Sequence, residues 1–224
     1  MDTVIKQIAR IETDFGTKFG VPRQAGISEK TEGRIVFEKE YRNPDALRGI
    51  EGFSHIWLIW GFSAVESEGW QPTVRPPRLG GNERMGVFAT RSPFRPNRLG
   101  LSCVRLLRLE QSGDEGTVLI VGGADLMNGT PIYDIKPYIP YADCRQDASS
   151  GYAPDPGRHV AVSVPPGELE KIPPDKREAL IEVLSTDPRP GYHSDPERIY
   201  GMSFAGRDVR FRVSDGTAEV TEII

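Results

Sequence analysis

An arginine-rich loop carries the strongest chemical signal in the sequence. The segment Met85–Ser102 reads MGVFATRSPFRPNRLGLS, and its arginines stand at Arg91, Arg95 and Arg98 with prolines between them. Because proline fixes the backbone angle φ, such a loop has little conformational entropy left to lose when a ligand binds. Forked guanidinium groups suit phosphates and carboxylates. The pattern therefore predicts a preorganised anion-binding loop, with ordinary surface salt bridges as the alternative.

The arginine loop lies inside a basic segment of an otherwise acidic chain. The 224 residues carry a net charge of −4, yet residues 75–108 contain eight arginines, no lysine and one acid, Glu83. A uniform negative charge would argue against a nucleic-acid partner, whereas a concentrated basic segment can attract one. The charge pattern favours a polyanionic partner for this segment.

Two further segments contain side chains that could contact a ligand. In DLMNGTPIYDIKPY (Asp125–Tyr138), Asp134 and Lys136 are two residues apart on a predicted strand and therefore lie on one face of it. They form either a functional pair or a plain ion pair. In FGVPRQAG (Phe19–Gly26), a proline precedes an arginine, and this pattern taken alone is typical of a surface turn.

Several common types of site have no signature in this sequence. There is no glycine-rich dinucleotide turn, no P-loop and no G-x-S-x-G nucleophile motif. Two cysteines without CxxC spacing and three histidines argue against a structural metal. No apolar stretch approaches the ~20 residues of a membrane span, and Met1–Arg10 lacks the apolar core of a secretion signal. We expect a cytoplasmic protein with no metal and no membrane partner.

These segments must be positioned by a fold that the sequence describes as mainly β. Ser54–Phe62 (SHIWLIWGF) is a continuous apolar run, too short for a buried helix, which predicts a strand covered on both faces. The other strand-forming segments of this part of the chain are Val4–Ile11, Gly33–Glu38, Val87–Thr90, Leu101–Leu109, Thr117–Gly122, Ile132–Lys136 and Val160–Val164. Short strands between turns, without long intervening helices, predict an all-β barrel or sandwich over residues 1–165.

The composition changes near residue 165, and the segment that follows predicts a small α+β domain over residues 166–224. Lys176–Leu184 has the apolar spacing of a helix. Three strand signals come after it: Arg198–Phe204, the strictly alternating Val209–Val213, and Thr217–Ile223 after an Asp-Gly hairpin turn.

The longer motifs, taken together, resemble the TrmO family of tRNA methyltransferases, also called YaeB or TsaA. The blocks that carry the resemblance are FGVPRQAG, LRGIEGFSHIWLIWGF, PTVRPPRLGGNERMGVFATRSPFRPNRLGLS, NGTPIYDIKPY, STDPRPGYHSDPERIYGMSF and RDVRFRV, which cover nearly the whole chain. The resemblance implies a single-sheet antiparallel β-barrel enzyme that acts as a homodimer. It also implies methyl transfer from S-adenosylmethionine to the exocyclic amine of threonylcarbamoyladenosine, just 3′ of the anticodon. The partner would then be a tRNA anticodon stem-loop.

The resemblance also assigns a cofactor pocket residue by residue. An aromatic such as Phe62 could face the sulfonium or stack on adenine, and Arg23 or Arg91 could bind the carboxylate of S-adenosylmethionine. The cofactor-binding residues carried over are Pro22, Arg23, Gln24, Phe62, Ser63, Arg91, Leu101, Asp125, Leu126, Met127 and Asn128. Two positions depart from the family pattern: Arg98 replaces a usual proline, and Asn128 replaces a common aspartate.

Roles in catalysis and RNA binding follow from the same resemblance. Removing a proton from the attacking nitrogen should assist methyl transfer, and Asp134 or Asp125 is the candidate base. Lys136 could neutralise the carboxylate of the threonine moiety. The expected contacts to RNA phosphate and to an unstacked base are Arg95, Arg98, Arg189 and Tyr192.

Two other functions are compatible with the motifs. A barrel that only binds RNA would use the arginine loop without chemistry, and its binding would not depend on S-adenosylmethionine. A barrel methyltransferase acting on a small metabolite would keep the cofactor pocket, but replacing Arg95 and Arg98 with alanine would leave its turnover unchanged.

Overall fold

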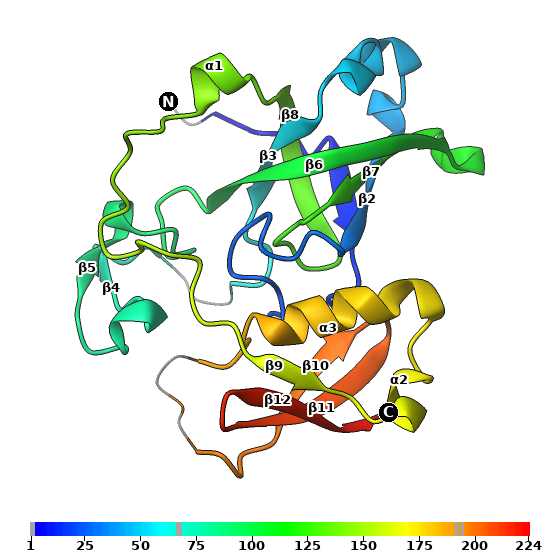
Figure 1. The fold of residues 1–224 in the computed structure, drawn as a ribbon. Helices are drawn as coiled ribbons and strands as arrows, with labels where there is room; N and C mark the ends of the chain where they lie inside the picture. The colour runs from blue at the N-terminus through cyan, green and yellow to red at the C-terminus, as the bar shows by residue number, and fades with distance from the viewer. Residues whose placement is uncertain (1–2, 66–68, 191–192, 194) are drawn as a thin grey trace.

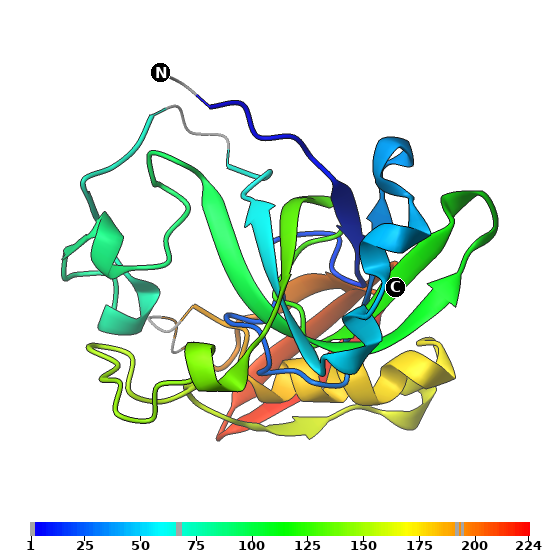
Figure 2. The same ribbon diagram turned by 90° about the horizontal axis from the view of Figure 1, so that it is seen from above.

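Within the described residues, six antiparallel strands close into a barrel (Figures 1 and 2). The computed structural model describes residues 3–65, 69–190, 193 and 195–224. The strand order around the barrel is β1-β2-β7-β6-β3-β8. The strands are β1 (Ala9–Glu12), β2 (Glu32–Phe37), β3 (His55–Gly61), β6 (Leu99–Gln111), β7 (Thr117–Gly122) and β8 (Thr130–Pro137). The expected single-sheet antiparallel barrel is confirmed.

The apolar run of β3 forms the centre of the barrel. Its alternate side chains Ile56, Leu58 and Trp60 are buried inside, because successive residues of a strand point to opposite faces. β3 pairs with β6 on one side and with β8 on the other, and Leu58 lies opposite Ser102. The side chains of the opposite phase, including Trp57, lie on the outer face and are partly exposed. The prediction that both faces are covered is therefore wrong for the single chain.

Two predicted strands of the barrel region differ from the observed structure. Val87–Thr90 is not a strand, because the 3₁₀ turn Val87–Ala89 occupies it and follows a short hairpin. The strands of that hairpin are β4 (Thr73–Val74) and β5 (Met85–Gly86). The first residue of the turn is buried, which explains the apolar signal. The opening strand begins at Ala9 rather than Val4, since pairing with β2 and β8 starts there.

A four-stranded sheet and two helices form the C-terminal domain, drawn from yellow to red in Figure 1. These elements are β9 (Ala161–Ser163), α2 (Pro166–Leu169), α3 (Arg177–Ser185), β10 (Tyr200–Phe204), β11 (Arg207–Ser214) and β12 (Thr217–Ile223). The small α+β domain is confirmed. β9 pairs in parallel with β12, so the predicted strand Val160–Val164 belongs to this sheet and not to the barrel. The short helix α1 (Pro140–Asp143) lies between the two sheets in the chain.

The loop between β1 and β2, residues 13–31, joins the two domains. Phe15 is buried in the C-terminal core, where its ring meets Phe204 edge-on at a centroid distance of 5.7 Å. Asp14 forms an ion pair with Lys176 at 2.8 Å. Figure 1 shows this loop in blue between the barrel and α3. The FGVPRQAG segment is therefore part of the joint between the domains and not a free surface turn.

Neither a membrane span nor a metal cluster is found in the described part of the chain. None of its helices has the length and apolar character needed to cross a bilayer. Nowhere in it do three or more potential ligands from histidine, cysteine, aspartate or glutamate gather. Both cysteines are free thiols, with Cys103 half-buried and Cys144 exposed.

Candidate active site at the end of the barrel

A cavity of about 480 Å³ opens at the end of the barrel where β3 ends and β8 begins. Its wall is mostly apolar, and its size is within the range of small-molecule sites. It is lined by Lys18, Val21, Trp60, Gly61, Phe62, Ser63, Ala64, Val65, Pro93, Phe94, Asp125, Leu126, Met127 and Thr130. The predicted cofactor-binding residues among these are Phe62, Ser63, Asp125, Leu126 and Met127. Motifs that are far apart in the sequence thus meet in one cavity.

Asp125 is the carboxyl group at the wall of this cavity, and two other side chains fix its position. The Ser102 hydroxyl donates a hydrogen bond to Asp125 Oδ1 at 2.5 Å, and the Trp60 indole N–H donates to Ser102 Oγ at 2.9 Å. Ser102 and Trp60 are both buried and come from neighbouring strands. Burial raises the pKa of Asp125 above that of an ordinary aspartate. The cavity therefore contains a fixed carboxyl group with increased proton affinity.

Trp60 and Phe62 form an aromatic corner of the cavity. Their rings meet edge-on, with centroids 4.4 Å apart and an interplanar angle of 62°. The Trp60 indole lies directly against Gly100 of β6, where an added Cβ atom would be only 2.2 Å from Trp60 Cε2. Gly100 therefore provides the space that this ring needs. The corner offers aromatic surface of the kind that stacks on a planar or cationic ligand.

Two arginines of the predicted anion-binding loop are bonded to backbone oxygens of neighbouring segments. Arg95 Nη1 donates to the carbonyl oxygens of Val87 at 3.0 Å and Thr90 at 2.7 Å. Arg98 Nη1 donates to the carbonyl oxygen of Val65 at 3.2 Å. These bonds hold the loop in one shape, so at least part of each guanidinium group has a structural role.

The remaining arginines of the predicted cofactor pocket connect separate parts of the chain. Arg91 donates a hydrogen bond to the side-chain oxygen of Gln24, which joins the arginine loop to the loop after β1. Arg23 donates to the backbone oxygens of Asp187 at 3.1 Å and Arg189 at 2.6 Å. None of these side chains is among those that line the cavity. Arg23 thus contacts the C-terminal domain in this structure.

Pro22 and Asn128, also predicted in the pocket, lie beside it in the chain. Pro22 is buried and follows the cavity residue Val21. Asn128 Oδ1 accepts a hydrogen bond from the Thr13 backbone N–H at 3.1 Å, which ties the turn before β8 to the end of β1. Both residues are thus next to cavity residues in the chain, and neither lines the cavity.

Asp134 and Lys136 lie on the outer face of the barrel and not in the cavity. Lys136 Nζ is 2.9 Å from Asp134 Oδ2, and the two side chains are 63% and 47% exposed. Asp134 lies opposite Ile59 of β3, which is flanked on its other side by Leu101 of β6. Leu101 is 56% exposed on this same face. Of the two candidate bases, Asp125 is the one that lines the cavity.

The predicted RNA contacts from the C-terminal domain are only partly described. Arg189 forms two parallel hydrogen bonds with the carboxylate of Asp187, at 2.8 and 2.9 Å. The two side chains are 13% and 10% exposed. Tyr192 lies outside the described residues. Arg189 is therefore a largely buried member of an ion pair in this structure.

Sequence reasoning missed several residues of the site. Trp60 and Gly61 directly precede the predicted residue Phe62 in the apolar run, and Phe94 lies between Arg91 and Arg95. Their positions within these motifs could have identified them. Ser102 had no such signal, because its contact with Asp125 joins positions 23 residues apart.

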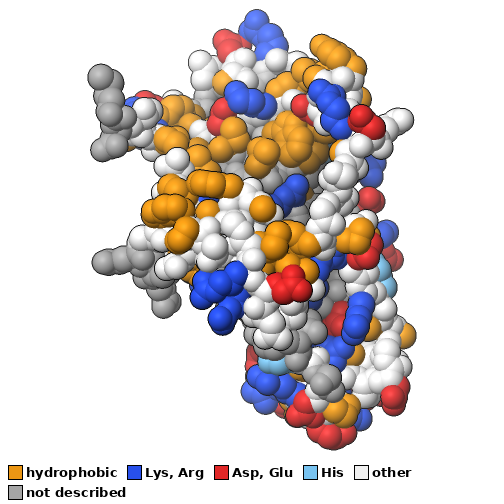
Figure 3. Space-filling model, turned by 90° about the vertical axis from the view of Figure 1, so that its left-hand side faces the viewer, with side chains coloured by type: hydrophobic (Ala, Val, Ile, Leu, Met, Phe, Trp, Pro, Cys, Tyr) orange, Lys and Arg blue, Asp and Glu red, His pale blue; other side chains and the backbone are white. Residues whose placement is uncertain are grey.

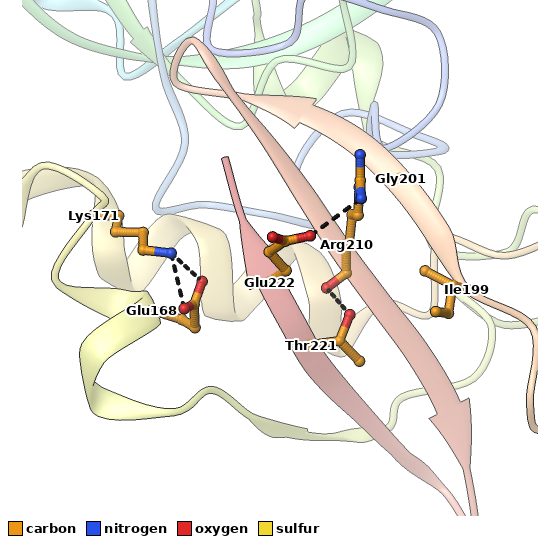
Figure 4. A pocket seen from close by; sticks show the side chains of 7 residues that line it. All are labelled: Glu168, Lys171, Ile199, Gly201, Arg210, Thr221 and Glu222. Carbon is orange, nitrogen blue, oxygen red and sulfur yellow. Dashed lines mark hydrogen bonds and ion pairs between the residues drawn. The ribbon is translucent and has the colours of Figure 1, made fainter.

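A second hollow of about 640 Å³ lies on the C-terminal domain (Figure 4). It is lined by Glu168, Lys171, Ile199, Gly201, Arg210, Thr221 and Glu222. The charged groups in it pair with one another: Lys171 is 2.8 Å from Glu168, and Arg210 is 3.1 Å from Glu222. Because these charges are already compensated within the chain, the hollow offers no group set aside for a ligand.

Comparison with known proteins assigns both parts of the chain to one family. The model of the tRNA-methyltransferase O N-terminal domain matches residues 10–144, and that of the TrmO C-terminal domain matches residues 166–224. The chain is 43% identical over 224 residues to the tRNA (adenine(37)-N6)-methyltransferase of Escherichia coli (strain K12), covering 96% of this chain and 95% of that one. It is 38% identical over 215 residues to a Pseudomonas aeruginosa protein named as a candidate S-adenosylmethionine-dependent methyltransferase, covering 92% and 91% of the two chains.

A solved structure extends the match to the whole fold. The crystal structure of TrmO from Pseudomonas aeruginosa superimposes with a TM-score of 0.80 at 29% identity and covers 100% of this chain and 99% of that chain. Barrel and C-terminal domain are therefore both part of the likeness. The chain belongs to the TrmO family of tRNA methyltransferases.

Proposed function

We propose that this protein transfers a methyl group from S-adenosylmethionine to the exocyclic amine of threonylcarbamoyladenosine, just 3′ of the anticodon of tRNA. The observation that carries the proposal is the cavity at the end of the barrel, where family motifs surround a half-buried carboxyl group. The relative from E. coli is named for the methylation of adenine 37 at N6. The resemblance of the motifs supports a threonylcarbamoyl group on the substrate adenine.

The cavity has the chemical features that S-adenosylmethionine requires. Trp60 and Phe62 offer aromatic surface to adenine or to a sulfonium cation. Lys18 is an exposed cation at the edge of the cavity and can pair with a carboxylate. When bound, the cofactor supplies a methyl group on a positively charged sulfur. The residues present therefore fit this group.

We assign the role of general base to Asp125. The attacking nitrogen belongs to a urea-like group whose lone pair is delocalised, so loss of its proton increases its nucleophilicity. The bonds from Trp60 to Ser102 and from Ser102 to Asp125 hold the acceptor at a constant position in the cavity. The raised pKa of Asp125 brings its basicity closer to that needed near neutral pH. Asp134, in contrast, is an exposed partner of Lys136.

The substrate can be tested directly with radiolabelled S-adenosylmethionine. The purified protein is incubated with tRNA that reads ANN codons, prepared with and without threonylcarbamoylation. We expect label in the threonylcarbamoylated tRNA and none in the unmodified tRNA. Calorimetric titration with S-adenosylmethionine alone gives a second readout, because cofactor binding does not require tRNA.

The alternative functions give different results in the same assay. A barrel that only binds RNA would retain tRNA without incorporating label, and its affinity would not depend on S-adenosylmethionine. A methyltransferase of small metabolites would bind the cofactor and leave every tRNA unlabelled. Equal labelling of modified and unmodified tRNA would refute the proposed substrate.

We also propose that the protein forms a homodimer through the outer face of β3, β6 and β8. On this face the Trp57 indole N–H donates to Asp143 of α1 at 3.0 Å, and the neighbouring Tyr141 and Leu101 are 89% and 56% exposed. Figure 3 shows hydrophobic side chains gathered over the barrel half of the side that carries α1 and the β4–β5 hairpin. Exposed apolar patches of this kind mark interaction surfaces.

Light scattering measures the mass of the particle in solution. We expect about twice the 24.8 kDa of one chain. The Leu101→Glu variant is expected to be monomeric, because it buries a charge at the proposed interface. Ile199→Glu is the matched control, since Ile199 is 59% exposed on the C-terminal domain. A wild-type monomer at micromolar concentration, or a dimer that tolerates Leu101→Glu, would show the proposal to be wrong.

A further inference from the structure

Two exposed aromatic side chains lie together beside the arginine loop. Trp70 is 49% exposed and Phe88 is 72% exposed. Their ring centroids are 6.4 Å apart, and the ring planes are inclined by 20°. They are neighbours because the β4–β5 hairpin joins the segments that carry them. An aromatic ring left in water forgoes about 1.5–3 kcal/mol of burial, so an adjacent pair of exposed rings suggests a binding surface.

Backbone hydrogen bonds fix the two segments that carry the rings. The N–H of Val87, next to Phe88, donates to the Pro72 carbonyl at 3.0 Å, and the N–H of Gln71, next to Trp70, donates to the Phe94 carbonyl at 3.0 Å. Val87 itself is buried. The aromatic pair is therefore anchored to the same loop as Phe94, a residue of the cavity wall.

The guanidinium group of Arg95 lies over one of the two rings. The Arg95 guanidinium carbon is 5.7 Å from the centroid of the Phe88 ring, and its two bonds to backbone carbonyls fix it there. Rings and guanidinium planes are the surfaces on which proteins stack unpaired bases. We define Trp70, Phe88 and Arg95 as the aromatic platform.

The charge around the platform favours a polyanion over a second copy of the chain. Of the eight arginines in residues 75–108, Arg105 and Arg108 lie on β6, where Arg108 pairs with Glu32 and Glu110, and Arg78 pairs with Asp155. The hairpin and the arginine loop carry the other five: Arg75, Arg84, Arg91, Arg95 and Arg98. Arg75 is exposed, and Arg84 donates to the Thr73 hydroxyl at 2.9 Å at the base of the same hairpin. Pairing of two copies through this patch would bring two arginine-rich segments together, which like-charge repulsion opposes. Aromatic rings within a basic segment are instead the combination found in sites for single-stranded nucleic acid.

We propose that the aromatic platform stacks on an unpaired base of the tRNA anticodon loop while the neighbouring modified nucleotide occupies the cavity. The inference rests on the proposed function for the identity of the RNA. Because Phe94 and Arg95 are consecutive, one loop forms both a wall of the cavity and a side of the platform. The platform thus selects RNA in which bases are free to stack, that is, a single-stranded loop and not a continuous duplex.

The test combines stacking variants with a matched control. Trp70→Ala and Phe88→Ala are expected to raise KM for tRNA by on the order of tenfold each with little change in kcat, the effect of losing one stacked base. Trp70→Phe and Phe88→Tyr keep an aromatic face and should restore most of the affinity. Phe53→Ala removes a ring that is 38% exposed just before β3, outside the platform, the cavity and the proposed dimer face, and should leave KM unchanged.

A binding measurement separates this inference from the proposed activity. Anisotropy of a labelled 17-nucleotide anticodon hairpin, and of a duplex of the same length, requires no methyl transfer. We expect the alanine variants to weaken hairpin binding about tenfold and to leave the weaker duplex binding unchanged. Stacking should also quench tryptophan fluorescence in the wild type, and this quenching should be smaller in Trp70→Phe, which retains Trp60 in the cavity, although the hairpin still binds.

Wild-type hairpin affinity in the Trp70→Ala/Phe88→Ala double variant would overturn the inference. A fall in particle mass of the double variant in light scattering would show that a second copy covers the platform, and would also overturn it. If the wild type methylates no tRNA but still binds the hairpin through the two rings, the proposed function fails and the platform stands.

Discussion

Substitution of Asp125 by asparagine is expected to lower the rate constant of methyl transfer by about 10²–10⁴-fold, the range typical of a lost general base. Asparagine has nearly the same shape, and its amide oxygen can still accept the hydrogen bond from Ser102. It cannot take the proton of the attacking nitrogen. The measurement is single-turnover methylation of threonylcarbamoylated tRNA at saturating S-adenosylmethionine, with cofactor affinity measured separately by calorimetry.

The pH dependence of the rate gives a second test of the same assignment. A base acts in its ionised form, so the wild-type rate should fall as the pH is lowered through the raised pKa of Asp125. This fall should be absent from the residual rate of Asp125→Asn. The free energy of unfolding has the opposite pH dependence to the rate. The protonated Asp125 carboxyl contributes stability at low pH, and this contribution is lost as the pH rises through the raised pKa. At neutral pH Asp125→Asn should therefore resist urea at least as well as the wild type.

Asp134→Asn is the control for this experiment. It removes a carboxylate from an exposed ion pair on the outer face of the barrel, where such pairs contribute little. We expect its rate to stay within about threefold of the wild type. Equal losses in Asp134→Asn and Asp125→Asn, or a wild-type rate in Asp125→Asn, would contradict the role of Asp125.

The strands could be predicted because each is a short apolar segment between turns. β3 is the clearest case, since only a strand buries Ile56, Leu58 and Trp60 on one side. Closure of the sheet could not be derived in the same way. It depends on the pairing of Ala9 with Ile132, which no local pattern encodes. The periodicity of the strands is therefore equally compatible with a barrel and with a sandwich. Only the family resemblance favoured the barrel.

The cavity could be predicted where motif residues are contiguous in the chain. Asp125–Met127 came with the turn before β8, and Phe62 came with the end of the apolar run. The partners of individual arginines could not be predicted. Arg95 and Arg98 bond to carbonyl oxygens that only the folded loop brings within reach. A guanidinium group in a sequence shows a capacity for five hydrogen bonds but not which acceptors will meet it.

Among these arginines, Arg189 has the partner that we expect to contribute most to stability. Its guanidinium group and the Asp187 carboxylate form a paired contact and are 13% and 10% exposed. Removing one partner of a largely buried ion pair leaves the other charge without compensation. We expect Arg189→Ala to lower the free energy of unfolding of the C-terminal domain by about 3 kcal/mol. Urea unfolding followed by circular dichroism measures this loss.

A direct RNA contact by Arg189 makes a different prediction. It requires Arg189→Ala to weaken tRNA binding at unchanged stability, and Asp187→Asn to leave tRNA binding intact. The ion pair instead requires both variants to lose stability, and asparagine at position 187 keeps the positive φ of 50° without strain. Arg210→Ala is the matched control, because its pair with Glu222 is about half exposed and should contribute at most about 1 kcal/mol. If Arg189→Ala and Arg210→Ala both unfold at the same urea concentration as the wild type, the buried pair does not stabilise the C-terminal domain. The guanidinium group of Arg189 can then be assigned to RNA binding.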